Sequence, residues 1–411
     1  MLGFGAGNQD GTDNNCQNLN IWTPGLNDGG LRPVLVWLHG GGFSTGTAND
    51  SSYDGEALAK NGDVVVVSVN HRLNVFGYLD LSAYDEKYKD SANVGMWDII
   101  AALEWIQQNI EVFGGDPDNV TVFGQSGGGA KVLGLMSTPY AVGLFHKGIV
   151  ESGVTETVGV NFTSQEASTR LAENLLAELN IAPENIEQLQ TVAVDKLQSA
   201  ATKALDATAQ EFQIPAPLTD GYQMEWEPVV DGDFLPTSPV TETNFADAGQ
   251  DIPLLIGSNL NEWTGFYRTS TDGVDTDALS AALKTAYPDK TDLTADHVDT
   301  LIRLPILKTM SHKADQNGAP VYAYLLTYGS SNHGAEIPYI FRHSDVSAMN
   351  DLFSSIWVNF ARSGVPSADS LPTWEPYTRE GGATMLLDTT SQLVYHHDDA
   401  LLKLLVPDYE Y

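Results

Sequence analysis

Cysteine is almost absent from this sequence of 411 residues, in which Cys16 is the only one. One cysteine cannot form an internal disulfide, which excludes a secreted disulfide framework and a metal site built from several thiolates. Long hydrophobic runs are also absent, since no stretch approaches the roughly 18 apolar residues of a membrane-spanning helix. Residues 1–6 have neither the basic nor the apolar region of a signal peptide. We expect a globular protein with no membrane anchor, whose compartment stays open, the cytoplasm being favoured over secretion.

Basic residues are scarce as well. Lys and Arg number 20 against 54 Asp and Glu, which gives a net charge of -34. Such a surface repels nucleic acid and anionic membranes, so we expect neither as a partner. The acidic residues are scattered along the chain, which is typical of a solvated surface. We hypothesise that this surface tolerates high salt.

What the sequence does contain is an alternation of short apolar runs and helical patterns. Residues 97–112 place Ile100, Leu103 and Ile106 at helical spacing, and a turn at 114–117 precedes the next apolar run. Strands separated by helices predict a doubly wound, mostly parallel sheet of the α/β class. The runs that we interpret as strands are 19–22, 33–38, 64–69, 120–122, 148–150, 253–257 and 321–326.

The domain organisation is expected to be simple. No repeat, low-complexity tract or linker divides the chain. Further helices are predicted at 130–136, 164–179 and 352–360. The interval at about 155–250 has few strand signals, so we interpret residues 1–411 as one catalytic domain with a helical cap or lid inserted at that interval.

A serine lies in a glycine-rich turn between a strand and a helix. Ser126 stands in Gly124-Gln125-Ser126-Gly127-Gly128, directly after the β-branched run 120–122. Gly-x-Ser-x-Gly in this context is typical of a nucleophile elbow, a turn so tight that its flanking positions tolerate little more than a hydrogen side chain. The turn would expose the Ser126 hydroxyl beside the free N–H groups of the helix. A bystander serine in a glycine-rich turn is the alternative.

A second glycine cluster follows the strand at 33–38. The sequence His39-Gly40-Gly41-Gly42-Phe43 would let backbone N–H groups approach a substrate carbonyl closely. We predict an oxyanion hole made by the N–H groups of Gly41, Gly42 and Gly127. The alternative is a flexible surface loop.

A serine hydroxyl needs a base, and the base needs an acid that fixes its tautomer. Downstream of Ser126, Glu262 lies just beyond the strand at 253–257, and His333 lies in a loop after the strand at 321–326. The order serine, acid, histidine is the one that this fold requires. We therefore predict Ser126 as nucleophile, Glu262 as acid and His333 as base, against the alternatives of a surface glutamate and a structural histidine.

Other histidines fit the role of the base less well. His297 and His312 lie in polar stretches that are helical or exposed in our interpretation. The His396-His397 pair beside Asp398 is expected in an exposed turn. No cofactor or metal is predicted.

Five segments carry a resemblance to a known family. The chain resembles the type-B carboxylesterases, an α/β-hydrolase family that includes para-nitrobenzyl esterases and cholinesterases, and the bacterial para-nitrobenzyl type is the most similar. The likeness covers nearly the whole chain and implies the same roles for Ser126, Glu262 and His333 and the same oxyanion hole. The segments are HGGGF, NVGMWDIIAALEWIQQNIEVFGGDPDNVTVFGQSGGG, GSNLNEW, HGAEIPYIF and WVNFARSGVPS.

The chain departs from the family pattern around the serine and at its start. Gln125 and Gly127 stand where the family usually has glutamate and alanine. The family's amino-terminal region, with the aromatic residue that binds choline in cholinesterases, has no counterpart here. The resemblance implies a serine carboxylesterase acting on short- to medium-chain acyl or aryl esters through an acyl-enzyme. A lipase or amidase on the same triad, and a non-catalytic binding or adhesion protein on the same scaffold, are the alternatives, and the oligomeric state is open.

Overall fold

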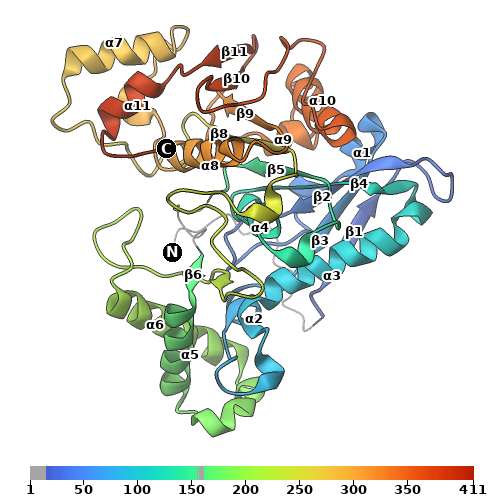
Figure 1. Cartoon of the computed structure of the whole chain (residues 1–411), viewed down its shortest axis with the longest axis vertical. Helices are drawn as coiled ribbons and strands as arrows, with labels where there is room; N and C mark the ends of the chain where they lie inside the picture. Colours follow the sequence, from blue (N-terminus) through green and yellow to red (C-terminus); the bar gives the residue numbers. More distant parts are fainter. Residues whose placement is uncertain (1–14, 155, 157–161) are drawn as a thin grey trace.

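A mixed sheet of nine strands forms the centre of the computed structural model, which describes residues 15–154, 156 and 162–411 (Figure 1). The strand order is β1-β3-β2-β4-β5-β8-β9-β10-β11, parallel from β3 to β10 and antiparallel at each edge. The strands are β1 (Asn18–Trp22), β2 (Arg32–Leu38), β3 (Val65–Asn70), β4 (Gly115–Gln125), β5 (Lys147–Glu151), β8 (Leu254–Asn259), β9 (Val321–Leu326), β10 (Ala383–Leu387) and β11 (Gln392–Tyr395).

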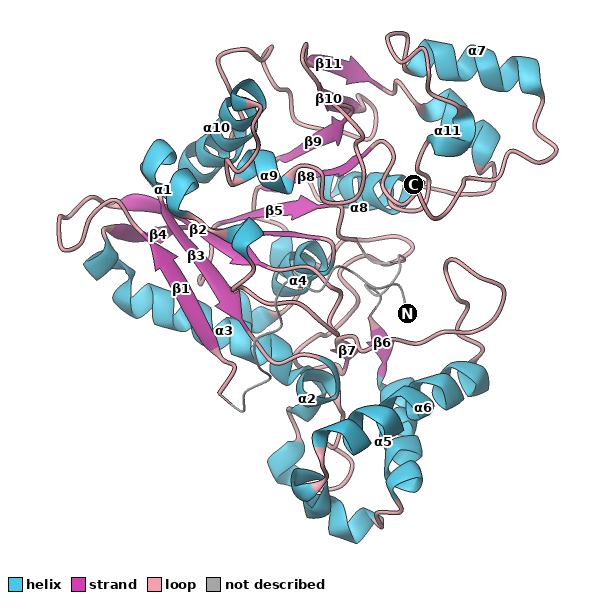
Figure 2. Ribbon diagram, turned by 180° about the vertical axis from the view of Figure 1, so that it is seen from behind, coloured by secondary structure: helices cyan, strands magenta, loops and turns pink. Residues whose placement is uncertain are grey.

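Helices cover both faces of this sheet (Figures 1 and 2). The longer ones are α3 (Val94–Asn109), α4 (Gly127–Leu135), α5 (Gln165–Leu179), α6 (Val194–Phe212), α7 (Thr276–Ala286), α8 (Arg303–Asp315) and α10 (Ser347–Ser363). Short helices are α1 (Glu56–Gly62), α2 (Asn74–Tyr78), α9 (Ile337–Ile340) and α11 (Asp399–Leu405). A separate pair of two-residue strands joins β6 (Thr163–Ser164) to β7 (Val229–Val230).

The alternation of side chains along each strand explains this layering. In β2, Val34 and Val36 belong to one hydrophobic core with residues of α3, α4 and α8. Leu35 and Trp37 belong to a second core with residues of α1, α9 and α10. All four side chains are fully buried. A strand that is apolar on both faces must be covered on both faces, and this is why the continuous apolar runs predicted a parallel sheet.

The α/β-hydrolase fold is confirmed, and every strand predicted from the sequence is present. Sequence reasoning placed the start of the strand before Ser126 too late, because β4 already begins at Gly115. It did not predict β10, β11, α7, α8 or α11.

The interval between β5 and β8 holds the two helices α5 and α6, which pack against each other at one end of the molecule (Figure 1). At the opposite end lie α7 and α11. In the part of the chain that the structure describes, no helix is both long and apolar enough to cross a membrane.

Candidate active site

Ser126 lies between the last residue of β4 and the first residue of α4, so strand, turn and helix come in the predicted order. Its backbone, with φ 57° and ψ −126°, has a conformation that residues other than glycine rarely adopt. The surrounding backbone holds it there, because its N–H donates to the Glu151 carbonyl at 2.8 Å and its carbonyl accepts from the Ala130 N–H at 3.1 Å. A strained serine on such a turn is what a nucleophile elbow requires.

The glycine loop, residues 39–43, follows β2 and lies against this turn. Gly41 and Gly42 have φ values of 88° and 60°, which favour glycine. A Cβ atom added to Gly127 would lie 2.4 to 2.6 Å from the carbonyl oxygen, Cα and nitrogen of Gly42. The backbones of the two predicted oxyanion clusters are therefore in contact.

Local hydrogen bonds orient two peptide units of the glycine loop. The Gly40 carbonyl lies 2.8 Å from His39 Nδ1, and the Gly41 carbonyl accepts from the Thr45 N–H at 3.1 Å. In a planar trans peptide the C=O and the N–H point in opposite directions. The N–H groups of Gly41 and Gly42 consequently point away from these partners, and within the described residues neither donates a hydrogen bond. Such unpaired N–H groups are suited to a negatively charged oxygen.

Glu262 and His333 come together because β8 and β9 are neighbours in the sheet. The loops after these parallel strands pair through a bridge between Glu262 and Asn332, and the His333 N–H donates to the Glu262 carbonyl at 3.1 Å. Between the side chains, His333 Nδ1 lies 2.6 Å from Glu262 Oε2. This is the contact by which a carboxylate fixes the tautomer of a base.

Two further donors hold the other oxygen of the buried Glu262 carboxyl. The Ser152 hydroxyl and the Asn259 N–H each donate to Oε1 at 2.6 Å. Burial raises the pKa of Glu262 to about 8, and these two hydrogen bonds act to lower it. Together with the Nδ1–H of His333, three donors favour the charged carboxylate.

The His333 ring is also enclosed. The Trp263 ring stacks on it with centroids 4.2 Å apart and an angle of 27° between the planes. Burial lowers the pKa of His333 to about 4, while Glu336 and Asp299 act to raise it. Its Nε2 is buried and has no hydrogen-bond partner among the described residues. The ring is therefore neutral at pH 7, with one nitrogen available as an acceptor.

The structure brings the serine turn and the histidine loop to one place. A Cβ atom added to Gly334 would lie 3.6 Å from Gln125 Nε2, so the residues next to His333 and Ser126 in the chain approach each other. Among the described residues the Ser126 hydroxyl makes no hydrogen bond to the His333 ring. Catalytic hydrogen bonds often form only in the complex with substrate.

Sequence reasoning missed the residues that support this cluster. Ser152 follows β5 directly, and Asn259 ends β8 and donates through Nδ2 to Glu336 at 2.6 Å. Both are polar residues at the carboxyl end of a parallel strand, where sites in such sheets are built, and this signal was open to the sequence analysis.

The remaining histidines lie elsewhere. His396 contacts Asp399 at 2.9 Å and is partly exposed, whereas the side chain of His397 is only 8% exposed. The expectation of an exposed turn was wrong for His397, because its ring packs edge-on against the buried Tyr287 ring. Within the described residues no group of three His, Cys, Asp or Glu side chains is arranged to hold a metal ion.

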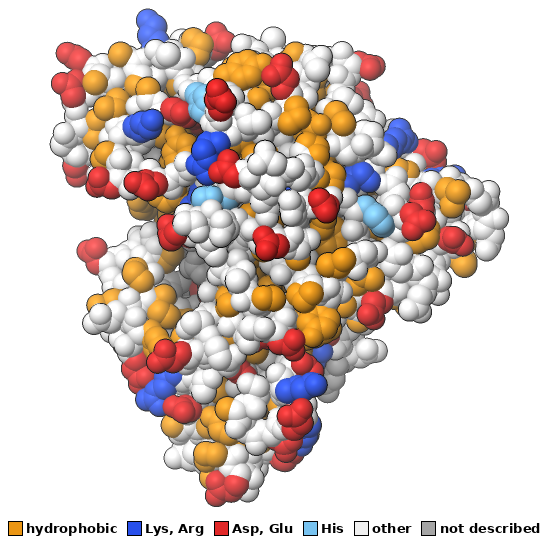
Figure 3. All heavy atoms as spheres, viewed as in Figure 1, with side chains coloured by type: hydrophobic (Ala, Val, Ile, Leu, Met, Phe, Trp, Pro, Cys, Tyr) orange, Lys and Arg blue, Asp and Glu red, His pale blue; other side chains and the backbone are white. Residues whose placement is uncertain are grey.

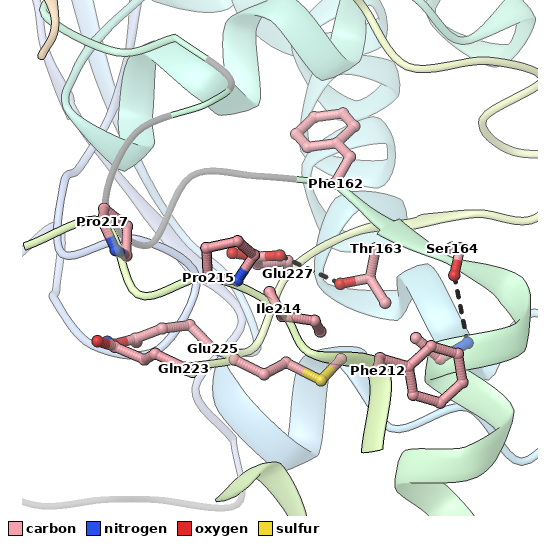
Figure 4. Close-up of a pocket in the computed structure, with 12 residues that line it drawn as sticks. Phe162, Thr163, Ser164, Phe212, Ile214, Pro215, Pro217, Gln223, Glu225 and Glu227 are labelled. Atoms are coloured by element: carbon pink, nitrogen blue, oxygen red, sulfur yellow. Dashed lines mark hydrogen bonds between the residues drawn. The ribbon is translucent and has the colours of Figure 1, made fainter. Parts of the chain in front are cut away.

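Figure 4 shows a cavity of about 300 Å³, and two of its lining residues, Phe162 and Glu225, contact the glycine loop or the residue after it. It is lined by residues around β6 and by the segment after α6, and apolar side chains such as Phe162 predominate. Phe162 also packs edge-on against Phe43 of the glycine loop, with ring centroids 6.1 Å apart. Glu225 and Glu227 are the acidic residues of the lining, and Glu225 accepts from the Ser44 hydroxyl at 3.4 Å.

A comparison with known families and proteins agrees with this geometry. The model of the carboxylesterase family matches residues 3–294 and 279–401. The para-nitrobenzyl esterase of Bacillus subtilis is 34% identical over 408 residues, which cover 91% of this chain and 79% of that protein. The human cocaine esterase is 31% identical over 428 residues, which cover 90% of this chain and 71% of that protein.

Solved structures give the same result. An esterase from the anaerobe Clostridium hathewayi, described as able to hydrolyse aliphatic aromatic polyesters, superposes with a TM-score of 0.84 at 34% identity and covers 96% of this chain and 82% of its own. A para-nitrobenzyl esterase superposes with a TM-score of 0.75 at 31% identity, and the match covers 95% of this chain and 85% of that one. The chain therefore belongs to the carboxylesterase family and is a carboxylic-ester hydrolase.

Proposed function

We propose that this esterase works through an acyl-enzyme on Ser126, with His333 as general base, Glu262 as the acid that orients it, and the N–H groups of Gly41, Gly42 and Gly127 as oxyanion hole. The observation that carries the proposal is the 2.6 Å contact between His333 Nδ1 and Glu262 Oε2, in loops beside the strained turn of Ser126.

The reaction would proceed in two similar halves. The Ser126 oxygen attacks the ester carbonyl carbon while His333 Nε2 takes the hydroxyl proton, and the carbonyl oxygen becomes an oxyanion held by the glycine N–H groups. The C–O bond to the alcohol then breaks, and His333 returns the proton to the leaving oxygen. Water repeats the sequence on the acyl-enzyme and releases the carboxylic acid.

The cavity beside the glycine loop would receive one side of the ester. Its size and apolar lining support short- to medium-chain acyl or aryl groups as ligands. Glu225 and Glu227 would repel a second carboxylate, so the preferred substrates would be neutral or cationic esters. We also propose that α5 and α6, which belong to the interval at 155–250, form the cap over this cavity.

The first test compares p-nitrophenyl acetate, butyrate and a long-chain ester, each with and without a serine-directed phosphonate, followed by peptide mass spectrometry of the adduct. Labelling of Ser126 that stops turnover is the expected result. The general base contributes about 10²- to 10⁴-fold and one oxyanion donor about 10²- to 10³-fold. Both act on the bond that Ser126 forms, so Ser126→Ala should nearly abolish turnover. Ser137→Ala serves as control, because Ser137 is buried just beyond α4 and, within the described residues, its hydroxyl bonds only to the Leu133 carbonyl.

A substrate panel then separates the alternatives. Activity confined to long-chain esters would favour a lipase, and cleavage of anilides would favour an amidase. A folded protein with neither turnover nor labelling would favour a binding role on this scaffold. Since the Clostridium hathewayi relative is described as a polyester hydrolase, the panel includes an oligomeric aromatic diester.

A further inference from the structure

A lysine is buried directly beneath the glycine loop. Lys131 lies on α4, the helix that begins after Ser126, and its side chain has no exposed surface. Its Nζ donates to the Gly42 carbonyl at 2.7 Å and to the His39 carbonyl at 3.0 Å, and lies 5.0 Å from the centroid of the Phe43 ring. All three of these contacts are with the glycine loop.

This placement is energetically unfavourable for the lysine itself. A buried ammonium group loses its hydration, and burial lowers the pKa of Lys131 to about 7. The titratable groups that face it are His39 and His71, whose stacked rings are buried and whose pKa values are lowered by burial and by the lysine. Within the described residues no carboxylate pairs with Lys131. An apolar side chain would fill the space without this cost, so the polar contacts need another explanation.

The two carbonyls that Lys131 binds belong to the peptide units on either side of the predicted oxyanion donors. The Gly41 and Gly42 N–H groups are oriented by local hydrogen bonds of Gly40 and Gly41, as described above. Lys131 fixes the flanking units, 39–40 and 42–43, to the helix that carries Ser126. It thereby links the position of the loop to the position of the serine.

We propose that Lys131 is a positioning residue of the oxyanion hole, which clamps the glycine loop to α4 at the distance from Ser126 that the tetrahedral intermediate requires. The inference rests on the proposed function. An oxyanion donor displaced by about 1 Å loses much of its effect, while binding of the ground-state ester changes little.

The test replaces Lys131 by methionine, which keeps the length and apolar stem but removes the donor. The matched control is Lys313→Met. Lys313 is likewise fully buried, donates to the Gln250 carbonyl at 2.8 Å and lies 6.0 Å from the Phe245 ring, and none of its contacts involves the glycine loop. Circular dichroism and melting temperature show whether each variant is folded.

Two readouts are measured with p-nitrophenyl butyrate and with a trifluoromethyl ketone, which Ser126 attacks to give a stable tetrahedral oxyanion. We expect Lys131→Met to lower kcat about 10- to 100-fold with KM changed less than about threefold, and to weaken ketone binding by a similar factor. Lys313→Met should leave kcat and ketone binding within about twofold of wild type.

The proposal is overturned if folded Lys131→Met keeps the wild-type kcat or changes only KM. It is also overturned if Lys313→Met loses as much kcat and ketone affinity as Lys131→Met. Should Lys131→Met not fold, Lys131→Leu, which also lacks a donor, decides: a loss in kcat and ketone affinity supports the clamp, and wild-type values overturn it. Wild-type turnover and Ser126 labelling are established first. A wild type that shows neither would contradict the catalytic roles proposed above, independently of Lys131.

Discussion

Buried carboxyl groups are the feature that distinguishes the candidate site at the scale of single residues. Glu151 accepts from Trp357 Nε1 at 2.7 Å, and Glu336 accepts from Asn259, yet neither has a cationic partner among the residues that the structure describes. Burial and their mutual proximity raise the pKa of Glu151 well above its usual value, and burial and Glu262 raise that of Glu336 to about 7. Burial acts to raise the pKa of Glu262 as well, but Glu262 accepts three hydrogen bonds, one of them from a histidine, and we therefore expect it to be the ionised carboxyl of the three.

The pH dependence of kcat/KM tests this charge assignment. Burial lowers the pKa of His333 and raises that of Glu262, and the pair takes up its inactivating proton as a unit. Because the carboxylate accepts three hydrogen bonds, we expect the proton to go to the imidazole, with an acid limb whose midpoint lies below pH 6.5. A midpoint above pH 7 in a pH series of kcat/KM would place the proton on Glu262 and contradict the assignment.

Ser152→Ala removes one of those hydrogen bonds. A hydrogen bond to a charged group is worth about 1.5–3 kcal/mol, so its loss should raise the pKa of Glu262 by about 1–2 units. The acid limb should then rise by up to the same amount, because in the variant the inactivating proton goes to the carboxyl group instead of the imidazole. The variant should therefore lose activity about 10- to 100-fold near pH 5 and little near pH 9. The measurement is kcat/KM against pH for wild type and variant. If kcat/KM of the variant were lower than that of the wild type by the same factor at every pH, Ser152 would not support the ionised carboxylate.

The residues that lie together at the candidate site could be predicted from the sequence, but the side chains that support them could not. Ser126, Glu262 and His333 follow strands that are visible as apolar runs, so their meeting at one edge of the sheet follows from the fold. The bonds from Ser152 and Lys131 depend instead on which strands are neighbours and on the path of the loops. The sequence marks Ser152 as a polar residue at the end of a strand, but no local pattern shows which group Ser152 or Lys131 contacts.

At the scale of elements, the accuracy of the sequence analysis depended on how the apolar residues are distributed. The helix α3 buries Leu103 and Ile106 on one face, and its periodicity predicted it. The helix α8 was missed because it also buries polar side chains, among them Arg303, Lys308 and Lys313. A helix that is buried nearly all round has no amphipathic period to detect.

Asp398 should stabilise the contact between α8 and α11. It pairs with Arg303 at 2.8 Å, and both side chains are almost fully buried. Removing one partner of a buried ion pair leaves the other charge buried and unpaired. We therefore expect Asp398→Asn to lower the free energy of unfolding by about 3–5 kcal/mol at pH 7. Asp351→Asn breaks the exposed pair with Arg342 and should cost no more than about 1 kcal/mol. Urea unfolding measures both, and equal losses would refute the distinction.

The ion pair between Asp398 and Arg303 also determines the direction in which the free energy of unfolding changes with pH. Burial acts to raise the pKa of Asp398, but Arg303 and His397 hold it at about 2, below its value in the unfolded chain. A carboxyl group whose pKa is depressed on folding stabilises the protein above its unfolded pKa, near 4, and this contribution is lost as the pH falls towards 2. The difference in unfolding free energy between wild type and Asp398→Asn should therefore shrink between pH 4 and pH 2.

At the scale of the whole molecule, charge is unbalanced. Acidic side chains are spread over the face seen in Figure 3 with few basic ones between them, in keeping with the net charge of -34. Repulsion among like charges destabilises the compact state, and at 0.1 M salt it is screened beyond about 10 Å.

Added salt should consequently stabilise the protein. We expect the melting temperature to rise between 10 mM and 500 mM NaCl and activity to persist at molar salt. KCl at equal ionic strength is the control, because screening does not depend on the identity of the cation. A steady fall in melting temperature and activity with rising salt would refute the hypothesis of salt tolerance.

The order of strands in the sheet also bears on how new variants of this enzyme can be assembled. β5 and β8 are hydrogen-bonded neighbours, although the chain leaves the sheet between them to form α5 and α6. Every residue to which we assign a chemical step lies outside this excursion. A chimera that takes the segment between β5 and β8 from a related esterase would keep its recombination points on two paired strands, and so exchange the walls of the cavity while leaving the reacting groups in register.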